Sequence, residues 1–161
     1  MALSVQCARE IISLLGVDGA LALERGLELS LRQACAMLSR PIARVHIEVV
    51  GDERMTALHA RFSNLATVTD VLTFPASRGS EPIDVDIAVC YGVAHAAAAE
   101  RGWGVERELL LYALHGVLHC AGFDDHDESE HRRMHEEEDR ILDALGVGRT
   151  FRHRVDGEAP Q

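Results

Sequence analysis

Two histidines and the acidic residues after them have the pattern of a metal-binding site. His115 and His119 are four residues apart, and residues at this spacing lie one turn apart on the same face of a helix. Both imidazoles can therefore bind one ion. Gly122 follows at the point where such a helix is expected to end, because glycine readily takes the left-handed conformation that turns the chain back. A third ligand is expected beyond this turn, and Asp125 and His126 are both candidates.

Three protein ligands leave a fourth position open, which is typical of catalytic zinc sites and not of structural ones. In metallopeptidases with the motif H-E-x-x-H, a glutamate directly after the first histidine is the general base. Here that residue is Gly116. The sequence therefore disfavours a peptidase, and any proton-transfer group must come from elsewhere in the chain.

Several short motifs, in the same order and with similar gaps, resemble the YbeY-type endoribonucleases, which are the bacterial rRNA maturation factors. The run H-G-V-L-H-C-A-G-F-D-D, which starts at His115, is similar to the family signature H-G-x-L-H-x-x-G-[YF]-D-H. Four further segments match family motifs: L-H-A-R-F from Leu58, T-D-V-L-T-F-P from Thr69, D-I-A-V from Asp86 and E-R-E-L from Glu106. The resemblance extends from about residue 45 to about residue 145.

This resemblance implies a metal-dependent endoribonuclease that cleaves single-stranded RNA in rRNA maturation and ribosome quality control. Its expected partners are rRNA and ribosome or small-subunit components, and its expected cofactor is one zinc ion bound by His115, His119 and one further residue. Asp125 keeps the spacing of the third histidine in the family, and a carboxylate oxygen is an ordinary zinc ligand. His126 is displaced by one position and would need a one-residue bulge.

The resemblance also implies residues for RNA binding and cleavage. The family has an arginine directly after the tyrosine of its L-N-x-x-Y motif, and this chain has Ser63 there. Arg61 is the candidate substitute, both for binding the substrate and for stabilising the phosphate charge in the transition state. His59 stands in place of the family's asparagine near the cleft and is a second candidate for substrate binding. Asp70 is expected either to orient the catalytic site or to cap a turn.

The absence of the family's arginine at Ser63 leaves an alternative of a different class. The protein would then be a non-catalytic ribosome assembly factor whose zinc ion only stabilises the fold. Such a factor would keep its ribosome binding after substitution of a metal ligand, provided that the variant folds.

The net charge of −10 is unusual for a protein that binds nucleic acid, because it repels phosphate at long range. The negative charge gathers between residues 124 and 143, where Glu136 to Glu138 are expected to form a solvated helix face. His131 and His135 lie in the same charged segment and are also expected to be exposed. A small basic cluster in the C-terminal tail is a candidate RNA or ribosome contact: Arg149, Arg152, His153 and Arg154.

The periodicity of apolar residues predicts the elements that must position these side chains. Helices are expected over residues 21–38, 54–63, 92–101 and 105–121, and a last helix from Asp127 to Gly146 with Glu130 in a capping-box position. Strands are expected over 2–7, 45–50, 71–74 and 85–90, so that Asp70 and Asp86 lie at strand beginnings. The helix over 105–121 has little polar surface apart from its histidines and is expected to run through the core. The predicted fold class is α+β, a small mixed sheet packed with helices.

Composition agrees with this class. The 161 residues, of which 47% are hydrophobic, suffice for a single domain over 1–161 with a tail from about residue 147. No apolar run is long enough to span a membrane and no leader pattern is present, so a soluble, cytoplasmic protein is expected. The cysteines form no C-x-x-C pair; Cys7, Cys35 and Cys90 are expected to be buried and reduced, and Cys120 to be structural.

Overall fold

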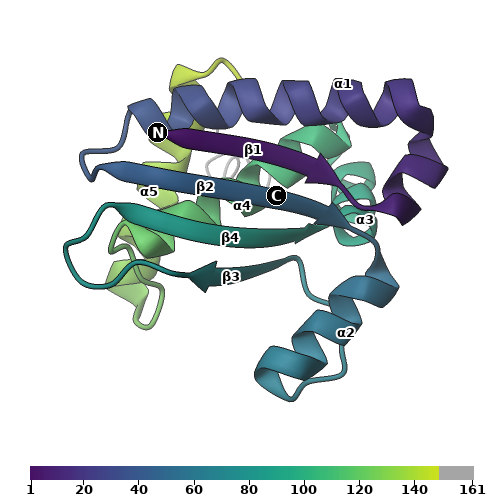
Figure 1. The fold of residues 1–161 in the computed structure, drawn as a ribbon. Helices are drawn as coiled ribbons and strands as arrows, with labels where there is room; N and C mark the ends of the chain where they lie inside the picture. Colours follow the sequence, from purple (N-terminus) through teal and green to yellow (C-terminus); the bar gives the residue numbers. More distant parts are fainter. Residues whose placement is uncertain (149–161) are drawn as a thin grey trace, which may run out of the picture.

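The computed structural model describes residues 1–148, and the predicted basic cluster at 149–154 lies outside them. Figure 1 shows one sheet and five helices in the described part of the chain. In chain order the elements are β1 (Ala2–Cys7), α1 (Arg9–Ala36), β2 (Ile42–Val50), α2 (Asp52–Ser63), β3 (Val71–Pro75), β4 (Ile83–Cys90), α3 (Tyr91–Arg101), α4 (Val105–Cys120) and α5 (Glu128–Ala144).

The four strands form one mixed sheet in the order β1-β2-β4-β3. The pairs β1–β2 and β2–β4 are parallel, and β3 is antiparallel to β4. Parallel neighbours need a crossover connection, which α1 supplies between β1 and β2, whereas the short segment 76–82 suffices to join the antiparallel pair. The predicted α+β class with a mixed sheet is thereby confirmed, and β3 forms one edge of the sheet.

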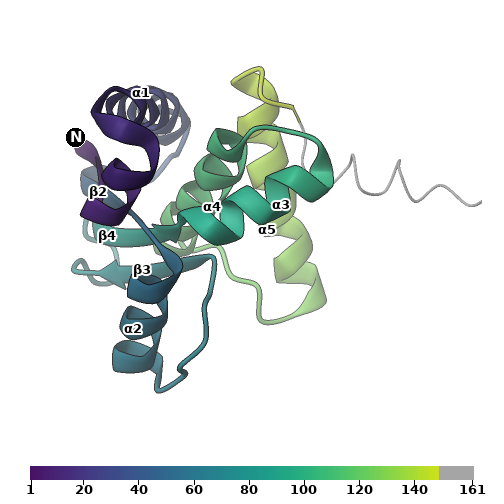
Figure 2. The same ribbon diagram turned by 90° about the vertical axis from the view of Figure 1, so that its right-hand side faces the viewer.

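Helix α4 lies at the centre of the molecule, between the sheet and α5 (Figure 2). Leu109, Leu114 and Leu118 of α4 are completely buried, as predicted for a helix that runs through the core. A Cβ atom at Gly116 would lie 2.9 Å from Ile87 Cδ1 and 3.0 Å from Thr73 Oγ1. Glycine therefore lets α4 approach β3 and β4 closely, and this contact leaves no room for a glutamate at the position that serves as general base in H-E-x-x-H peptidases.

Both ends of α4 are held by arginine side chains. Near its start, the buried carboxylate of Glu108 accepts hydrogen bonds from Arg101 Nη1 at 2.6 Å and from Trp103 Nε1 at 2.8 Å. At its end, Arg40 donates to the carbonyl oxygen of Cys120 at 2.7 Å and also binds carbonyl groups of the segment that precedes β4. These contacts give the histidines of α4 a rigid base.

Two predicted boundaries were wrong. The first helix begins at Arg9 and not near residue 21; Gly16, with φ of 77°, kinks it, and Leu14 and Val17 are exposed, so the first turns lack a regular apolar pattern. Asp86 is not at a strand beginning, because β4 already begins at Ile83. Its carboxylate instead accepts two hydrogen bonds from Arg44 of β2, the largest cause of a lowered pKa for Asp86.

The described residues contain no helix that is both long and apolar enough to cross a membrane. Cys7, Cys35 and Cys90 are buried and unpaired, as predicted. Burial raises the pKa of Cys7 to about 12 and the pKa values of Cys35 and Cys90 to about 11. These thiols therefore stay protonated at neutral pH, which agrees with a structural role.

Candidate metal centre

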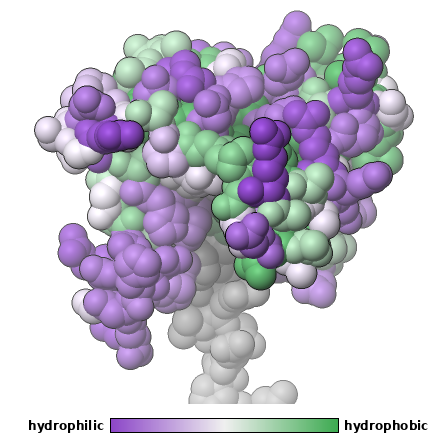
Figure 3. Space-filling model, turned by 60° about the horizontal axis from the view of Figure 1, so that its bottom comes forward, coloured by the Kyte–Doolittle hydropathy of each residue, from purple (hydrophilic) through white to green (hydrophobic). Residues whose placement is uncertain are grey.

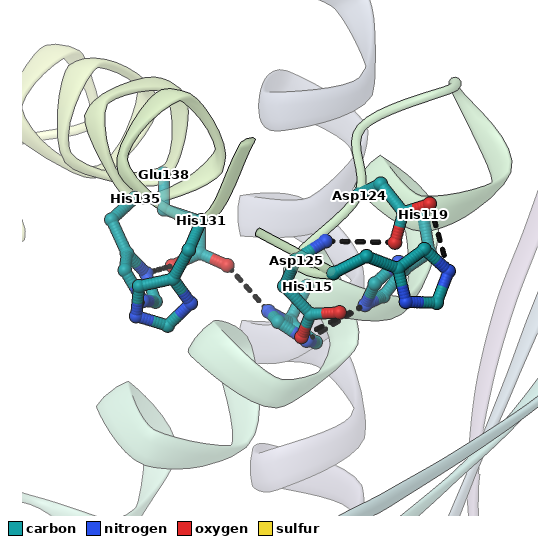
Figure 4. Close-up of polar contacts among 8 residues, drawn as sticks. His115, His119, Asp124, Asp125, His131, His135 and Glu138 are labelled. Carbon is teal, nitrogen blue, oxygen red and sulfur yellow. Dashed lines mark hydrogen bonds and ion pairs between the residues drawn. The ribbon is translucent and has the colours of Figure 1, made fainter. Parts of the chain in front are cut away.

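Three predicted ligand residues come together at the end of α4. The Nε2 atoms of His115 and His119 lie 3.0 Å apart, and Asp125 Oδ2 lies 3.8 Å from His119 Nε2 (Figure 4). One donor atom from each of the three residues lies within 4.8 Å of the other two. In a tetrahedral zinc site, two ligand nitrogens lie about 3.3 Å apart. The donor set therefore fits a small divalent cation.

A tight turn after α4 returns the chain to the histidines. Gly122 has a φ of 102°, the left-handed conformation predicted for it. The amide of Phe123 donates to the carbonyl oxygen of Leu118 at 3.0 Å, which closes the turn. The carboxylate of Asp124 then accepts from the backbone amide of Asp125 at 2.8 Å. The loop thus holds Asp125 beside the end of the helix that carries both histidines.

His126 lies elsewhere on the same loop. Its side chain is 83% exposed, and its Nε2 atom lies 3.1 Å from Asp124 Oδ2. Among the described residues, His126 forms a possible donor group with Asp124 and Asp125, whereas the group that contains His115 and His119 is completed by Asp125. The geometry therefore favours Asp125 as the third ligand of the histidine pair.

We expect Asp125→Ala to lower the affinity for zinc by more than about 100-fold, because loss of even an outer partner of a metal ligand costs roughly 10–100-fold. The matched control is His126→Ala, which removes a neighbouring exposed imidazole and should leave the affinity nearly unchanged. Both variants can be titrated with zinc in competition with a chromogenic chelator. The opposite ranking would assign the third position to His126.

A buried glutamate that the sequence analysis did not select supports the first histidine. His115 Nδ1 donates to Glu138 Oε1 at 2.6 Å, and the Glu138 side chain is completely buried. The prediction that Glu136 to Glu138 form a solvated face is wrong for Glu138, because α5 turns this residue toward α4. The sequence position of Glu138 could have indicated its burial. Glu138 is four residues after Met134 and three before Ile141, in the apolar stripe of α5.

The prediction for the second histidine pair is only half correct. His131 is exposed, but the His135 side chain is only 18% exposed, and its Nδ1 atom donates to Glu138 Oε2 at 3.0 Å. The physical reason is the burial of Glu138, since a carboxylate taken out of water needs partners for both of its oxygens. Glu138 therefore binds His115 with one oxygen and His135 with the other.

These contacts set the charge state of the site. Burial lowers the pKa of His115, but its hydrogen bond to Glu138 and the negative charges of Glu138, Asp125 and Asp70 outweigh burial, so that the pKa is raised overall. Burial conversely raises the pKa of Glu138, but the hydrogen bonds and the positive charges of His115 and His135 together lower it by more. Glu138 is thus held as a carboxylate. Because it engages the Nδ1 proton of His115, the Nε2 atom is left to face Asp125 and His119.

The other predicted site residues lie at β3 and α2. Asp70 precedes β3, and its Oδ1 atom accepts from the amide of Val71 at 2.8 Å, while its negative charge contributes to the raised pKa of His115. His59 donates from Nδ1 to the carbonyl oxygen of Thr67 at 2.8 Å. The Arg61 guanidinium lies 5.4 Å from the ring centroid of Phe62.

The edge strand β3 separates Arg61 from the histidines. The Phe62 ring packs edge-on against Phe74 of β3 at 4.8 Å between centroids, whereas the adjacent Thr73 faces α4 at Gly116. Consecutive strand residues point to opposite faces, so α2 packs on the sheet face opposite α4. The structure therefore places His59 and Arg61 across the β3 edge from the histidines, whereas Asp70 directly precedes β3. Figure 3 shows this side of the molecule, where hydrophobic and hydrophilic surface lie next to each other.

Comparison with known proteins identifies the family. The family model described as endoribonuclease YbeY matches residues 22–146. The chain belongs to this family. It is 33% identical over 137 residues to the endoribonuclease YbeY of Maricaulis maris, with 84% of this chain and 86% of that one covered. It is 34% identical over 115 residues to the endoribonuclease YbeY of Macrococcus caseolyticus, with 66% and 75% covered.

The fold is also similar to a solved structure. A solution structure of a protein from Thermotoga maritima matches with a TM-score of 0.58 at 21% identity, covering 89% of this chain and 91% of that one. The family and the fold class predicted from the sequence are confirmed. The segment matched to the family model includes α4, the loop with Asp125 and Glu138 of α5.

Proposed function

We propose that this protein is a metal-dependent endoribonuclease that cleaves single-stranded RNA in rRNA maturation and ribosome quality control, and that it acts in the cytoplasm. The observation that carries the proposal is the convergence of donor atoms from His115, His119 and Asp125 within 4.8 Å of one another. This donor set occurs in a member of a family that is named for endoribonuclease activity. Membership favours an enzyme over a non-catalytic ribosome assembly factor.

The proposed cofactor is one zinc ion held by His115, His119 and Asp125. Zinc bound there would act as a Lewis acid and lower the pKa of water at its open position. Glu138 keeps His115 in the tautomer that presents Nε2 to the site. Asp70, the candidate for orienting the catalytic site, is proposed as a positioning residue, because it directly precedes β3 and its negative charge favours the protonated form of His115.

The proposed RNA path crosses the β3 edge of the sheet. Phe62 is 56% exposed, and an exposed ring gives an unpaired base a surface on which to stack. Arg61 lies against that ring and is proposed to bind a backbone phosphate, since a guanidinium suits phosphate recognition. His59, on the same helix, is the second proposed substrate contact. A base in a duplex cannot stack in this way, which supports a preference for single strands.

The experiment compares metal-stripped protein with protein reloaded with zinc. Each is incubated with an end-labelled rRNA fragment, either single-stranded or annealed to its complement, and binding to small ribosomal subunits is measured in parallel. We expect cleavage of the single strand only, and only after zinc is restored. If zinc restores no cleavage although the subunits still bind the protein, the non-catalytic assembly factor replaces the nuclease.

A further inference from the structure

Helix α5 carries a second histidine pair that repeats the geometry of the first. His131 and His135 are four residues apart, their Nε2 atoms lie 2.7 Å apart, and their rings meet at 86°. The corresponding values for His115 and His119 are 3.0 Å and 84°. Two imidazole nitrogens that converge in this way can bind the same cation, whichever helix presents them.

One buried carboxylate orients an imidazole in each pair. Glu138 Oε1 accepts from His115 Nδ1 at 2.6 Å, and Glu138 Oε2 accepts from His135 Nδ1 at 3.0 Å (Figure 4). An imidazole that donates its Nδ1 proton to a carboxylate presents Nε2 as the ligand nitrogen, and the carboxylate makes that nitrogen more basic. The hydrogen bond to Glu138 therefore orients the His135 imidazole to present Nε2, as it does for His115.

We propose that His131 and His135 form a second binding site for a divalent transition-metal cation, and that Glu138 couples this site to the first. Imidazole ligands suit zinc, copper and nickel. His131 is exposed, so water can complete the coordination. The second site has two neutral ligands, whereas the first set includes the Asp125 carboxylate, so the second site binds more weakly. This proposal goes beyond the nuclease function and does not require cleavage.

Zinc titration of the metal-stripped protein by calorimetry, with elemental analysis of the product, tests the second site. Wild type is expected to bind two equivalents, the second with at least about tenfold lower affinity. His131→Ala should lose the weak equivalent alone, and His119→Ala the tight one. The matched control His95→Ala removes an exposed imidazole from α3 and should retain both.

The outcomes distinguish failure of the second metal site from failure of the first site, on which the nuclease function depends. The second site does not exist if His131→Ala binds zinc like the wild type, or if the wild type binds only one equivalent. Neither result would contradict the assignment of the first site. If His119→Ala retains the tight equivalent, the assignment of the first site is wrong. Glu138→Gln, with its fold checked by circular dichroism, should weaken both equivalents by about 10–100-fold. Weakening of the tight equivalent alone would overturn the coupling.

Discussion

Replacement of His119 by alanine is expected to remove bound zinc and to reduce zinc-dependent RNA cleavage by at least about 100-fold. Loss of an outer partner of a metal ligand already costs roughly 10–100-fold in affinity or activity, and His119 is a proposed ligand itself. The side chain is partly exposed, so the truncation should leave the core intact. Zinc content by elemental analysis and cleavage of a single-stranded rRNA fragment are measured on the same preparation, with circular dichroism as the test of folding.

His95→Ala is the control for this experiment, since it removes one imidazole from the surface of α3. It should change neither the zinc content nor the rate of RNA cleavage. A folded His119→Ala protein that is free of zinc but cleaves at the wild-type rate would contradict the proposed function. Cleavage would then have to come from groups outside the histidine and aspartate cluster.

Glu138→Ala is expected to destabilise the metal-free protein by about 3–5 kcal/mol, because it leaves two histidines without the buried carboxylate that binds them. The matched control is Glu137→Ala. Glu137 pairs with Arg140 at 2.6 Å, but the arginine is half-exposed, so its loss should cost no more than about 1 kcal/mol. Urea unfolding of both variants measures the loss in free energy of unfolding. Equal losses would show that the buried carboxylate of Glu138 contributes no more to stability than the exposed pair.

The contribution of Glu138 should depend on pH. The pKa of Glu138 is lowered by folding, so its contribution is present above its ordinary value of 4.5 and is lost as the pH falls further. The pKa of His115 is raised by folding, so its contribution is present below its ordinary value of 6.5 and is lost as the pH rises through the folded pKa. The difference in stability between wild type and Glu138→Ala should therefore be largest between these two values and decrease on the alkaline side. A difference that is constant with pH would contradict this ionic coupling.

The local pattern of apolar and turn-forming residues predicted most of the helices and strands. The helix that carries His115 and His119 follows from its nearly continuous apolar sequence, and the turn at Gly122 follows from the conformational freedom of glycine. The last helix has the expected cap, in which the Asp127 side chain accepts from the amide of Glu130 at 2.8 Å. The first half of α1 was missed, because Gly16 and exposed leucine and valine residues obscure the helical period there. Periodicity reports a helix only when one of its faces is buried.

Residues near one another along the chain were enough to predict the family, the fold class and the pairing of His115 with His119, with Asp125 or His126 as the third ligand. The three-dimensional structure was needed to favour Asp125 over His126 and to show which side chains surround the histidines. The packing of α5 against α4 turned Glu138 inward and placed its carboxylate between two histidine pairs. The antiparallel pairing of β3 placed α2 and Arg61 on the opposite face from the histidines. Such contacts join residues that are distant in sequence, so no local spacing indicates them.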